Sequence, residues 1–266
     1  MRIALGVEYD GSRFHGWQTQ QPGVRTVQTA VEAALSRVAD EPISVICAGR
    51  TDTGVHAREQ VVHFDTTARR PPHGWVMGAN VHLPDDVSVL WAQEVDADFH
   101  ARFSAIERTY RYWILNRLSR PALLARRATW IHRPLDAERM HRAGQALLGT
   151  HDFTSYRTVH CQANSPVRTL RRLRVERHGD LLCLEVSADG FLHHMVRNIA
   201  GVLIAIGSGE ASEDWAAEVL ACRDRTLGGV TAPPHGLYFH RVDYPPAVVL
   251  PRVTDEGGAT LLPAAP

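Results

Sequence analysis

One carboxylate in this chain stands where it could act as an acid, a base or a nucleophile. Asp52 follows an apolar run over residues 43–48, lies two positions after Arg50, and is bounded by Gly49 and Gly54. The apolar run and the alternating segment 60–65 both predict strands, so Asp52 falls on a glycine-bounded connection at a sheet end. Loops held by a rigid sheet often carry catalytic groups. The alternative is a tight turn in which Asp52 only accepts local backbone N–H groups.

The basic residues are unevenly distributed along a chain whose formal net charge is zero. All 29 of them are arginine, and residues 102–177 hold 16 arginines against 5 acids. Arginine binds phosphate in a forked geometry and stacks on bases, and aromatic residues are interleaved in this segment, so the pattern predicts an RNA-binding surface. The alternative is a coding bias towards arginine, with strand faces such as 168–175 simply solvated.

Hydrophobic periodicity predicts two similar halves that would position these residues. In the first half we expect a strand at 3–9, a helix capped by Thr26, strands at 43–48 and 60–65, a helix at 73–82 and a strand at 86–95. In the second half we expect a strand at 108–115, a helix at 136–148 capped by Asp136, a hairpin of 167–176 and 181–186, helices at 192–206 and 212–222, and a strand at 237–242. This order predicts an α+β protein with mainly antiparallel sheets side by side and a domain border near 103–107.

The remaining composition argues against several classes of protein. The four cysteines are widely spaced without a C-x-x-C pair, which argues against a zinc site or a disulfide framework and favours a reducing cytoplasm. We expect neither a membrane span nor a signal segment. Fifteen histidines leave a metallohydrolase as an alternative, although none of them forms an H-E-x-x-H motif.

Six blocks of sequence resemble one known family. Residues 49–57, Gly-Arg-Thr-Asp-Thr-Gly-Val-His-Ala, are similar to the signature of the tRNA pseudouridine synthase A family, whose catalytic aspartate corresponds to Asp52. The other blocks follow in the family's order and are residues 9–18, 108–112, 149–157, 191–199 and 232–237. The resemblance therefore covers most of the chain and ends near residue 248.

The resemblance implies a complete set of expectations for fold and function. The chain would be an isomerase that converts uridine to pseudouridine at positions 38, 39 and 40 of the tRNA anticodon stem-loop, without a cofactor or a metal. It would have two ferredoxin-like halves, 1–105 and 106–247, with the active-site cleft between them. Residues 248–266 lie outside the resemblance, and we expect this proline-, alanine- and glycine-containing end to be a flexible tail. A cytoplasmic homodimer is implied as well. A non-catalytic RNA-binding module is the alternative that the arginine-rich segment alone would support.

The resemblance also implies roles for four residues besides Asp52. Tyr110 would stack on the target base and take the proton from C5, and Arg197 would pair with the catalytic aspartate. Arg50 would enter the RNA as the base leaves the stack, and Leu237 would line the base pocket. Two structural alternatives remain, because strand alternation can bury the Tyr110 ring in the core and Arg197 can merely brace helices.

Overall fold

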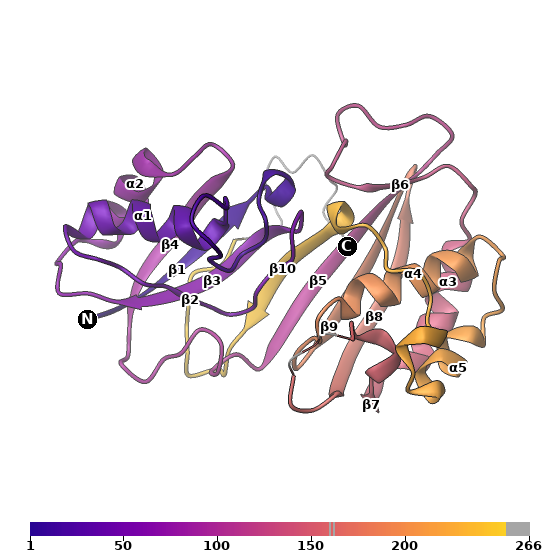
Figure 1. The fold of residues 1–266 in the computed structure, drawn as a ribbon. Coiled ribbons are helices and arrows are strands. Elements are labelled where there is room, and N and C mark those ends of the chain that lie inside the picture. The colour runs from indigo at the N-terminus through magenta and orange to yellow at the C-terminus, as the bar shows by residue number, and fades with distance from the viewer. Residues whose placement is uncertain (160, 162, 254–266) are drawn as a thin grey trace. The chain divides into compact units, whose positions relative to one another are not determined.

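The computed structural model describes residues 1–159, 161 and 163–253, and the chain divides into two compact units (Figure 1). The first unit holds Met1–Ile106 together with the described residues from Tyr238 onward, and the second holds Glu107–Leu237. Sequence analysis instead placed residues up to 247 in the second half. The chain returns to the first unit because Tyr238 and Phe239 pair in parallel with His56 and Ala57.

The first unit is built on a mainly antiparallel sheet. Its strands are β1 (Arg2–Tyr9), β2 (Ile46–Cys47), β3 (His56–Asp65), β4 (Val87–Val95) and β10 (Leu237–Asp243). Their order is β4-β1-β3-β10, with β2 paired to β3, and only the β3–β10 pairing is parallel. Alternation along β1 and β3 directs Leu5, Val62 and Phe64 to one buried face.

Two helices cover that face, α1 (Val27–Ala39) and α2 (Pro72–His82). Thr26 caps α1 as predicted, with its hydroxyl accepting from the Thr29 N–H at 3.3 Å. The Phe64 ring packs edge-on against Trp75 of α2, with ring centroids 5.2 Å apart. These contacts join the helices to the sheet.

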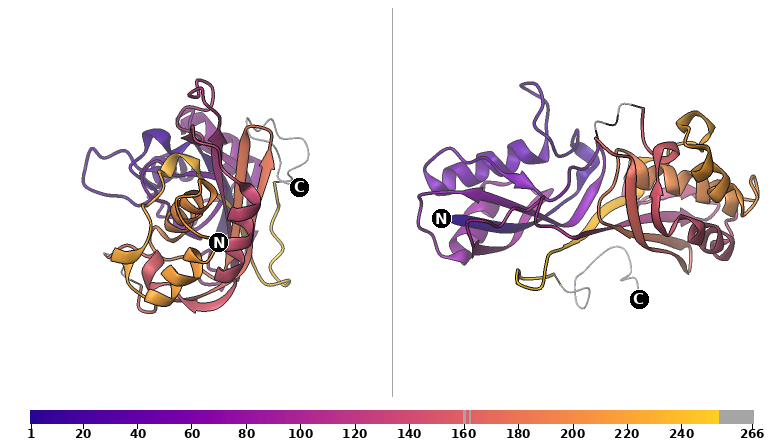
Figure 2. Two further views of the ribbon diagram at one scale, coloured as in Figure 1. Left: turned by 90° about the vertical axis from the view of Figure 1, so that its right-hand side faces the viewer. Right: turned by 90° about the horizontal axis from the view of Figure 1, so that it is seen from below.

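The chain after β10 crosses the other face of the first unit's sheet (Figure 2). The Tyr244 hydroxyl donates to the Ala101 carbonyl at 2.8 Å, and the Gln93 amide donates to the Val249 carbonyl at 2.8 Å. Residues 248–253, where the predicted flexible tail begins, therefore lie against the first unit. The rest of the predicted tail lies outside the described residues.

The strands of the second unit pair in the order β5-β9-β8-β7, and each of these pairings is antiparallel. Its strands are β5 (Glu107–Asn116), β6 (Thr129–Ile131), β7 (Gly149–Asp152), β8 (Val167–His178) and β9 (Leu181–Ala188), with β6 parallel to β5. The helices α3 (Ala137–Gly144), α4 (Met195–Gly207) and α5 (Trp215–Cys222) gather on one face of these strands (Figure 1). Mixed helices and mainly antiparallel strands confirm the predicted fold class at this level.

Asp136 caps α3 as predicted, but several expected elements are shorter in the structure, among them the helix expected at 212–222, which is α5 (Trp215–Cys222). The expected strand 43–48 is reduced to β2, because side chains of α1 take the neighbouring backbone N–H groups: Ser36 accepts from Ile43, and Glu32 accepts from Val45. Helix α4 starts at Met195 because His194 before it has a φ of 63°. The expected helix 136–148 ends in a 3₁₀ turn, Gln145–Leu147. No helix in the described part of the chain has the length and apolar character needed to cross a membrane.

Candidate active site

Asp52 lies on a tight turn between two strands of the first unit. The Val55 N–H donates to the Asp52 carbonyl at 3.1 Å, and Gly54 takes the positive φ of 80° that closes the turn. The Asp52 side chain is half-buried, whereas Arg50 is exposed. The predicted glycine-bounded connection is confirmed, and it places the carboxylate where it is partly shielded but still reachable.

Residues 9–18, called the N-terminal block below, fix the backbone of this turn. The Trp17 N–H donates to the Thr51 carbonyl at 3.0 Å, and the Gly54 N–H donates to the Phe14 carbonyl at 3.3 Å. The buried Tyr9 and Thr51 hydroxyls are hydrogen-bonded at 2.8 Å. Asp52 is therefore flanked on both sides by residues bound to a separate segment, which limits the directions its side chain can take.

Two glycines of that segment allow this close approach. A Cβ on Gly11 would lie 1.8 Å from the Val55 carbonyl oxygen. A Cβ on Gly16 would lie 2.7 Å from the Thr51 carbonyl oxygen, and Gly16 also has a φ of 88°. Both glycines lie within the block of residues 9–18 that resembles the family, but this role could not be assigned to them from the resemblance alone. The signal for it was the presence of two glycines in a segment otherwise rich in large side chains.

Burial keeps the Cys47 thiol and the Tyr9 phenol, both near the turn, in their protonated forms. Burial raises the pKa of the Cys47 thiol to about 12, and it raises the pKa of the Tyr9 phenol well above its ordinary value. A hydrogen bond from His56, at 3.2 Å, lowers the pKa of Asp10. The thiol and the phenol therefore stay protonated near neutral pH, and neither can serve as a base there.

Tyr110 lies on β5 in the second unit and is 8% exposed. Its ring meets Phe191 edge to face, with centroids 5.0 Å apart and an interplanar angle of 82°. Tyr112 follows on the same strand face and is fully buried; its hydroxyl donates to the Pro233 carbonyl at 2.8 Å and bonds the Thr129 hydroxyl at 2.6 Å. Burial raises the pKa of Tyr112, so its hydroxyl stays protonated.

Arg197 occupies the first turn of α4 and is half-buried. Its Nε–H donates to the Ala232 carbonyl at 2.8 Å, and the Ala232 N–H donates back to the Arg197 carbonyl at 3.1 Å. Ala232 begins the connection 232–237, and Leu237 at its end is 5% exposed. The connection packs so tightly on β5 that a Cβ on Gly236 would lie 2.4 Å from the Trp113 carbonyl oxygen.

The predicted residues thus fall into two groups. Arg50 and Asp52 share the turn of the first unit, and Tyr110, Arg197 and Leu237 belong to the second. Within the second unit, the connection 232–237 is bonded at one end to the helix of Arg197 and packs at the other on the strand of Tyr110.

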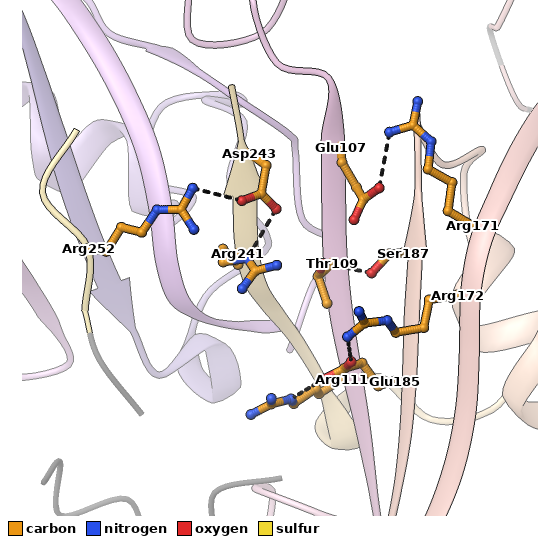
Figure 3. A network of polar contacts seen from close by, with 10 residues as sticks. All are labelled: Glu107, Thr109, Arg111, Arg171, Arg172, Glu185, Ser187, Arg241, Asp243 and Arg252. Carbon is orange, nitrogen blue, oxygen red and sulfur yellow. Dashed lines mark hydrogen bonds and ion pairs between the residues drawn. The ribbon is translucent and has the colours of Figure 1, made fainter. Parts of the chain in front are cut away.

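Two arginines of β8, Arg171 and Arg172, form ion pairs within the second unit (Figure 3). Arg171 binds Glu107 at 3.0 Å, and Glu185 binds both Arg172, at 3.1 Å, and Arg111, at 2.8 Å. Arg171 and Arg172 are exposed, and such surface pairs stabilise a protein by only about 0–1 kcal/mol each, whereas Arg111 is buried. They do neutralise part of the strand face that the sequence suggested for RNA, so the solvated-face interpretation gains support there.

The connection between β5 and β6 differs from β8 in its charge. Residues 117–127 contain four arginines and no acid. Arg117, Arg120 and Arg126 are exposed, and Leu118 and Leu123 are each 83% exposed. The two ends of this connection are joined by the Trp130 indole N–H, which donates to the Arg117 carbonyl at 2.9 Å. This connection is the more accessible part of the arginine-rich segment.

Comparison with known proteins assigns the chain to a family. The family model described as tRNA pseudouridine synthase matches residues 6–104 and 143–245. The tRNA pseudouridine synthase A of Pseudomonas aeruginosa is 60% identical over 250 residues, which cover 94% of this chain and 88% of that protein. The protein of the same name from Nitrosococcus oceani is 60% identical over 254 residues, which cover 96% of this chain and 98% of that protein. This chain belongs to the tRNA pseudouridine synthase A family.

The family match includes most of the candidate residues. Arg50 and Asp52 lie within the first matched range, and Arg197 and Leu237 lie within the second. Tyr110 falls between the two ranges of the tRNA pseudouridine synthase model, but the relatives of this name align over nearly the whole chain.

Proposed function

We propose that this chain isomerises uridine to pseudouridine at positions 38, 39 and 40 of the tRNA anticodon stem-loop, with Asp52 as the catalytic residue. Membership of the tRNA pseudouridine synthase A family carries the proposal. The Asp52 turn supports it, because a half-buried carboxylate held by the backbone of another segment suits chemistry that needs a fixed group.

The reaction requires the N1–C1′ glycosidic bond to break and a C5–C1′ bond to form. The proton on C5 leaves and N1 ends protonated, so the product has the composition of the substrate and no electron donor or acceptor is needed. Asp52 is the group proposed to act on the sugar or the base. A free Asp has a pKa of about 3.9, and a neighbouring guanidinium favours its ionised form.

Four residues have supporting roles in the proposal. Arg50 is exposed two positions from Asp52, as a side chain that enters the RNA must be. Flipping a base costs a few kcal/mol, and an inserted guanidinium offsets part of that. Arg197 is the proposed partner of the aspartate, and Leu237 is the proposed apolar wall for uracil. Tyr110 is proposed to stack on the base and to take the C5 proton.

At a coarser scale, the proposal includes two ferredoxin-like halves with a cleft, a homodimer and a cytoplasmic enzyme without cofactor or metal. Arginine contacts to phosphate would supply most of the tRNA affinity. The exposed arginines of residues 117–127 suit that task better than Arg171 and Arg172, which already bind carboxylates.

The proposal is tested by incubating the purified protein with unmodified tRNA transcripts and mapping pseudouridine by carbodiimide-dependent primer-extension stops. We expect stops at positions 38 to 40 with the wild type. We expect Asp52→Asn to lower the rate by at least about 10³-fold while tRNA affinity stays within a few-fold. Wild-type turnover by Asp52→Asn would contradict the catalytic assignment.

Asp40→Asn is the matched control for that substitution. Asp40 is exposed and has a φ of 58°, a conformation that asparagine also adopts readily. Its rate should equal that of the wild type. A wild-type protein that binds tRNA but never releases tritium from C5-labelled uridine would instead be a binding module.

A further inference from the structure

The connection that holds Arg197 has no regular structure of its own. Residues 228–233 contain neither helix nor strand, yet Ala232 accepts from the Arg197 Nε–H through its carbonyl and donates to the Arg197 carbonyl through its N–H. An irregular segment does not hold a fixed shape unless other groups bind its backbone. The position of the Arg197 guanidinium therefore depends on what fixes this connection.

A buried amide lies at the centre of the contacts that fix it. Asn198 follows Arg197 in α4 and is only 2% exposed. Its Nδ2 donates to the Tyr156 carbonyl at 2.7 Å, and its Oδ1 accepts from the Thr231 hydroxyl at 2.7 Å. Thr231 directly precedes Ala232, so the helix residue after Arg197 holds the residue before Ala232.

Arg225 completes the cluster. One of its terminal nitrogens donates to Asn198 Oδ1 at 3.0 Å and to the Thr231 hydroxyl at 2.9 Å, and the other donates to the Gly229 carbonyl at 3.0 Å. The guanidinium is half-buried, and each of these acceptors belongs either to α4 or to the connection. Arg225 thus links Gly229 and Thr231 of the connection to Asn198 of α4.

The helix surface is shaped to receive the connection. Gly201 lies one turn after Arg197, on the same side of α4. A Cβ on Gly201 would lie 1.8 Å from the Val230 carbonyl oxygen, so any larger residue would push the connection away. The approach at Gly201 and the hydrogen bonds of Asn198 act on adjacent residues of one short segment.

We propose that Asn198, Arg225 and Thr231 are positioning residues for Arg197, acting through the Ala232 carbonyl. Together they set the direction of the Arg197 guanidinium by holding the carbonyl to which its Nε–H donates. This inference rests on the proposed function, in which Arg197 pairs with the catalytic aspartate. A displacement of about 1 Å in a catalytic group can cost on the order of 10²-fold in rate.

Thr231→Val tests the proposal, because valine keeps the shape of threonine and removes only the hydroxyl. We expect the single-turnover rate of pseudouridine formation to fall about tenfold, while tRNA affinity stays within about twofold. Thr231→Ser keeps the hydroxyl and should restore the rate to within about twofold of the wild type. Thr150→Val is the control, because it removes a hydroxyl pair with Thr169 at 2.8 Å on the exposed edge of the same unit.

A coupling experiment separates positioning from general destabilisation. If Thr231 acts through Arg197, then Thr231→Val should add little to the loss already caused by Arg197→Lys. The proposal would be overturned if the fold-losses in rate of the two single variants multiplied in the double variant. It would also be overturned if Thr231→Val and Thr150→Val had equal rates.

Hydrogen exchange of the Arg197 side chain tests the positioning role without depending on the proposed activity. The Nε–H of Arg197 can be observed by ¹⁵N nuclear magnetic resonance and assigned from its absence in Arg197→Lys. We expect its hydrogen exchange to be at least about tenfold faster in Thr231→Val than in the wild type or Thr150→Val. Unchanged exchange would overturn the positioning role even in a protein with no activity, whereas faster exchange without pseudouridine formation would overturn only the proposed function.

Discussion

At the scale of the residue, Tyr110 and Tyr112 lie on the same face of β5. We expect a chemical role for Tyr110 and a packing role for Tyr112. Tyr110→Phe keeps the ring against Phe191 and removes only the hydroxyl. We therefore expect the rate of pseudouridine formation to fall by about 10²-fold, a typical contribution of a proton-transfer group, with tRNA affinity and melting temperature almost unchanged. Single-turnover assays and thermal melts would measure both effects.

Tyr112→Phe is the matched control and should show the opposite pattern. It leaves the buried Pro233 carbonyl and Thr129 hydroxyl without their partner, at a cost of about 1–3 kcal/mol in unfolding free energy. Its rate per folded molecule should fall less than that of Tyr110→Phe. An unchanged rate for Tyr110→Phe would leave that ring with a packing role only.

His63 should make the stability of the first unit depend on pH. It is 2% exposed, its Nδ1 accepts from the Ala101 N–H at 3.1 Å, and burial beside His100 and Arg2 lowers its pKa to about 4. The unfolded chain binds this proton near pH 6.5, so the stabilisation is complete above that pH and is lost as pH falls towards 4. By pH 5 the loss should be about 2 kcal/mol.

His63→Gln offers the measurement, because a glutamine carbonyl can still accept from Ala101. Urea unfolding at pH 7 and at pH 5 should show a larger loss of unfolding free energy for the wild type than for the variant, by about 2 kcal/mol. Equal losses in the two proteins would contradict the assignment of this pH dependence to His63.

At the scale of the element, the N-terminal block, residues 9–18, matters because it holds the backbone of the Asp52 turn. Gly16→Ala should lower both stability and rate, since the new Cβ would lie 2.7 Å from the Thr51 carbonyl oxygen next to Asp52. We expect a loss of about 2 kcal/mol or more in unfolding free energy and a fall of at least tenfold in single-turnover rate. Both quantities can be measured on the purified variant.

Gly23→Ala is a close control for that substitution. Gly23 has the same φ of 88°, but its Cβ would meet nothing within 4 Å. It should therefore cost only the backbone strain of about 1–2 kcal/mol and leave the rate unchanged. If the two variants lose rate equally, strain rather than contact with the turn is the cause.

Sequence patterns predicted the longer elements and the Asp52 turn because these depend on local periodicity and glycine placement. Helix α1 with its Thr26 cap and the hairpin of β8 and β9 follow from such local signals. The shortening of strand β2 could not be predicted, because Glu32 and Ser36 of α1 accept from the backbone N–H groups of Val45 and Ile43, just before it. The short strands β6 and β7 have too few residues for a period to show.

At the scale of the whole molecule, periodicity predicted the strand near 237–242 but could not indicate which unit it joins. Parallel pairing with β3 brings Tyr238 onward into the first unit, so that unit is discontinuous in sequence. The positions of Arg197 and Leu237 depend in the same way on contacts between distant segments. Their roles came from the family resemblance and not from local pattern.

The discontinuity leads to a prediction about fragments. Residues 107–237 form a compact unit that is continuous in sequence and contains paired strands and the helices α3, α4 and α5, so we expect them to fold alone with a cooperative thermal transition. Residues 1–106 alone lack Phe239 and Tyr244, which are 0% and 9% exposed, and burying one such side chain stabilises a protein by about 1.5–3 kcal/mol. The fragment 1–106 should therefore lack a cooperative transition and recover one when residues 238–253 are joined to it by a flexible linker. Circular dichroism melts of the three fragments would measure this, and equal melting of 1–106 with and without the added segment would contradict the role of β10 in the first unit.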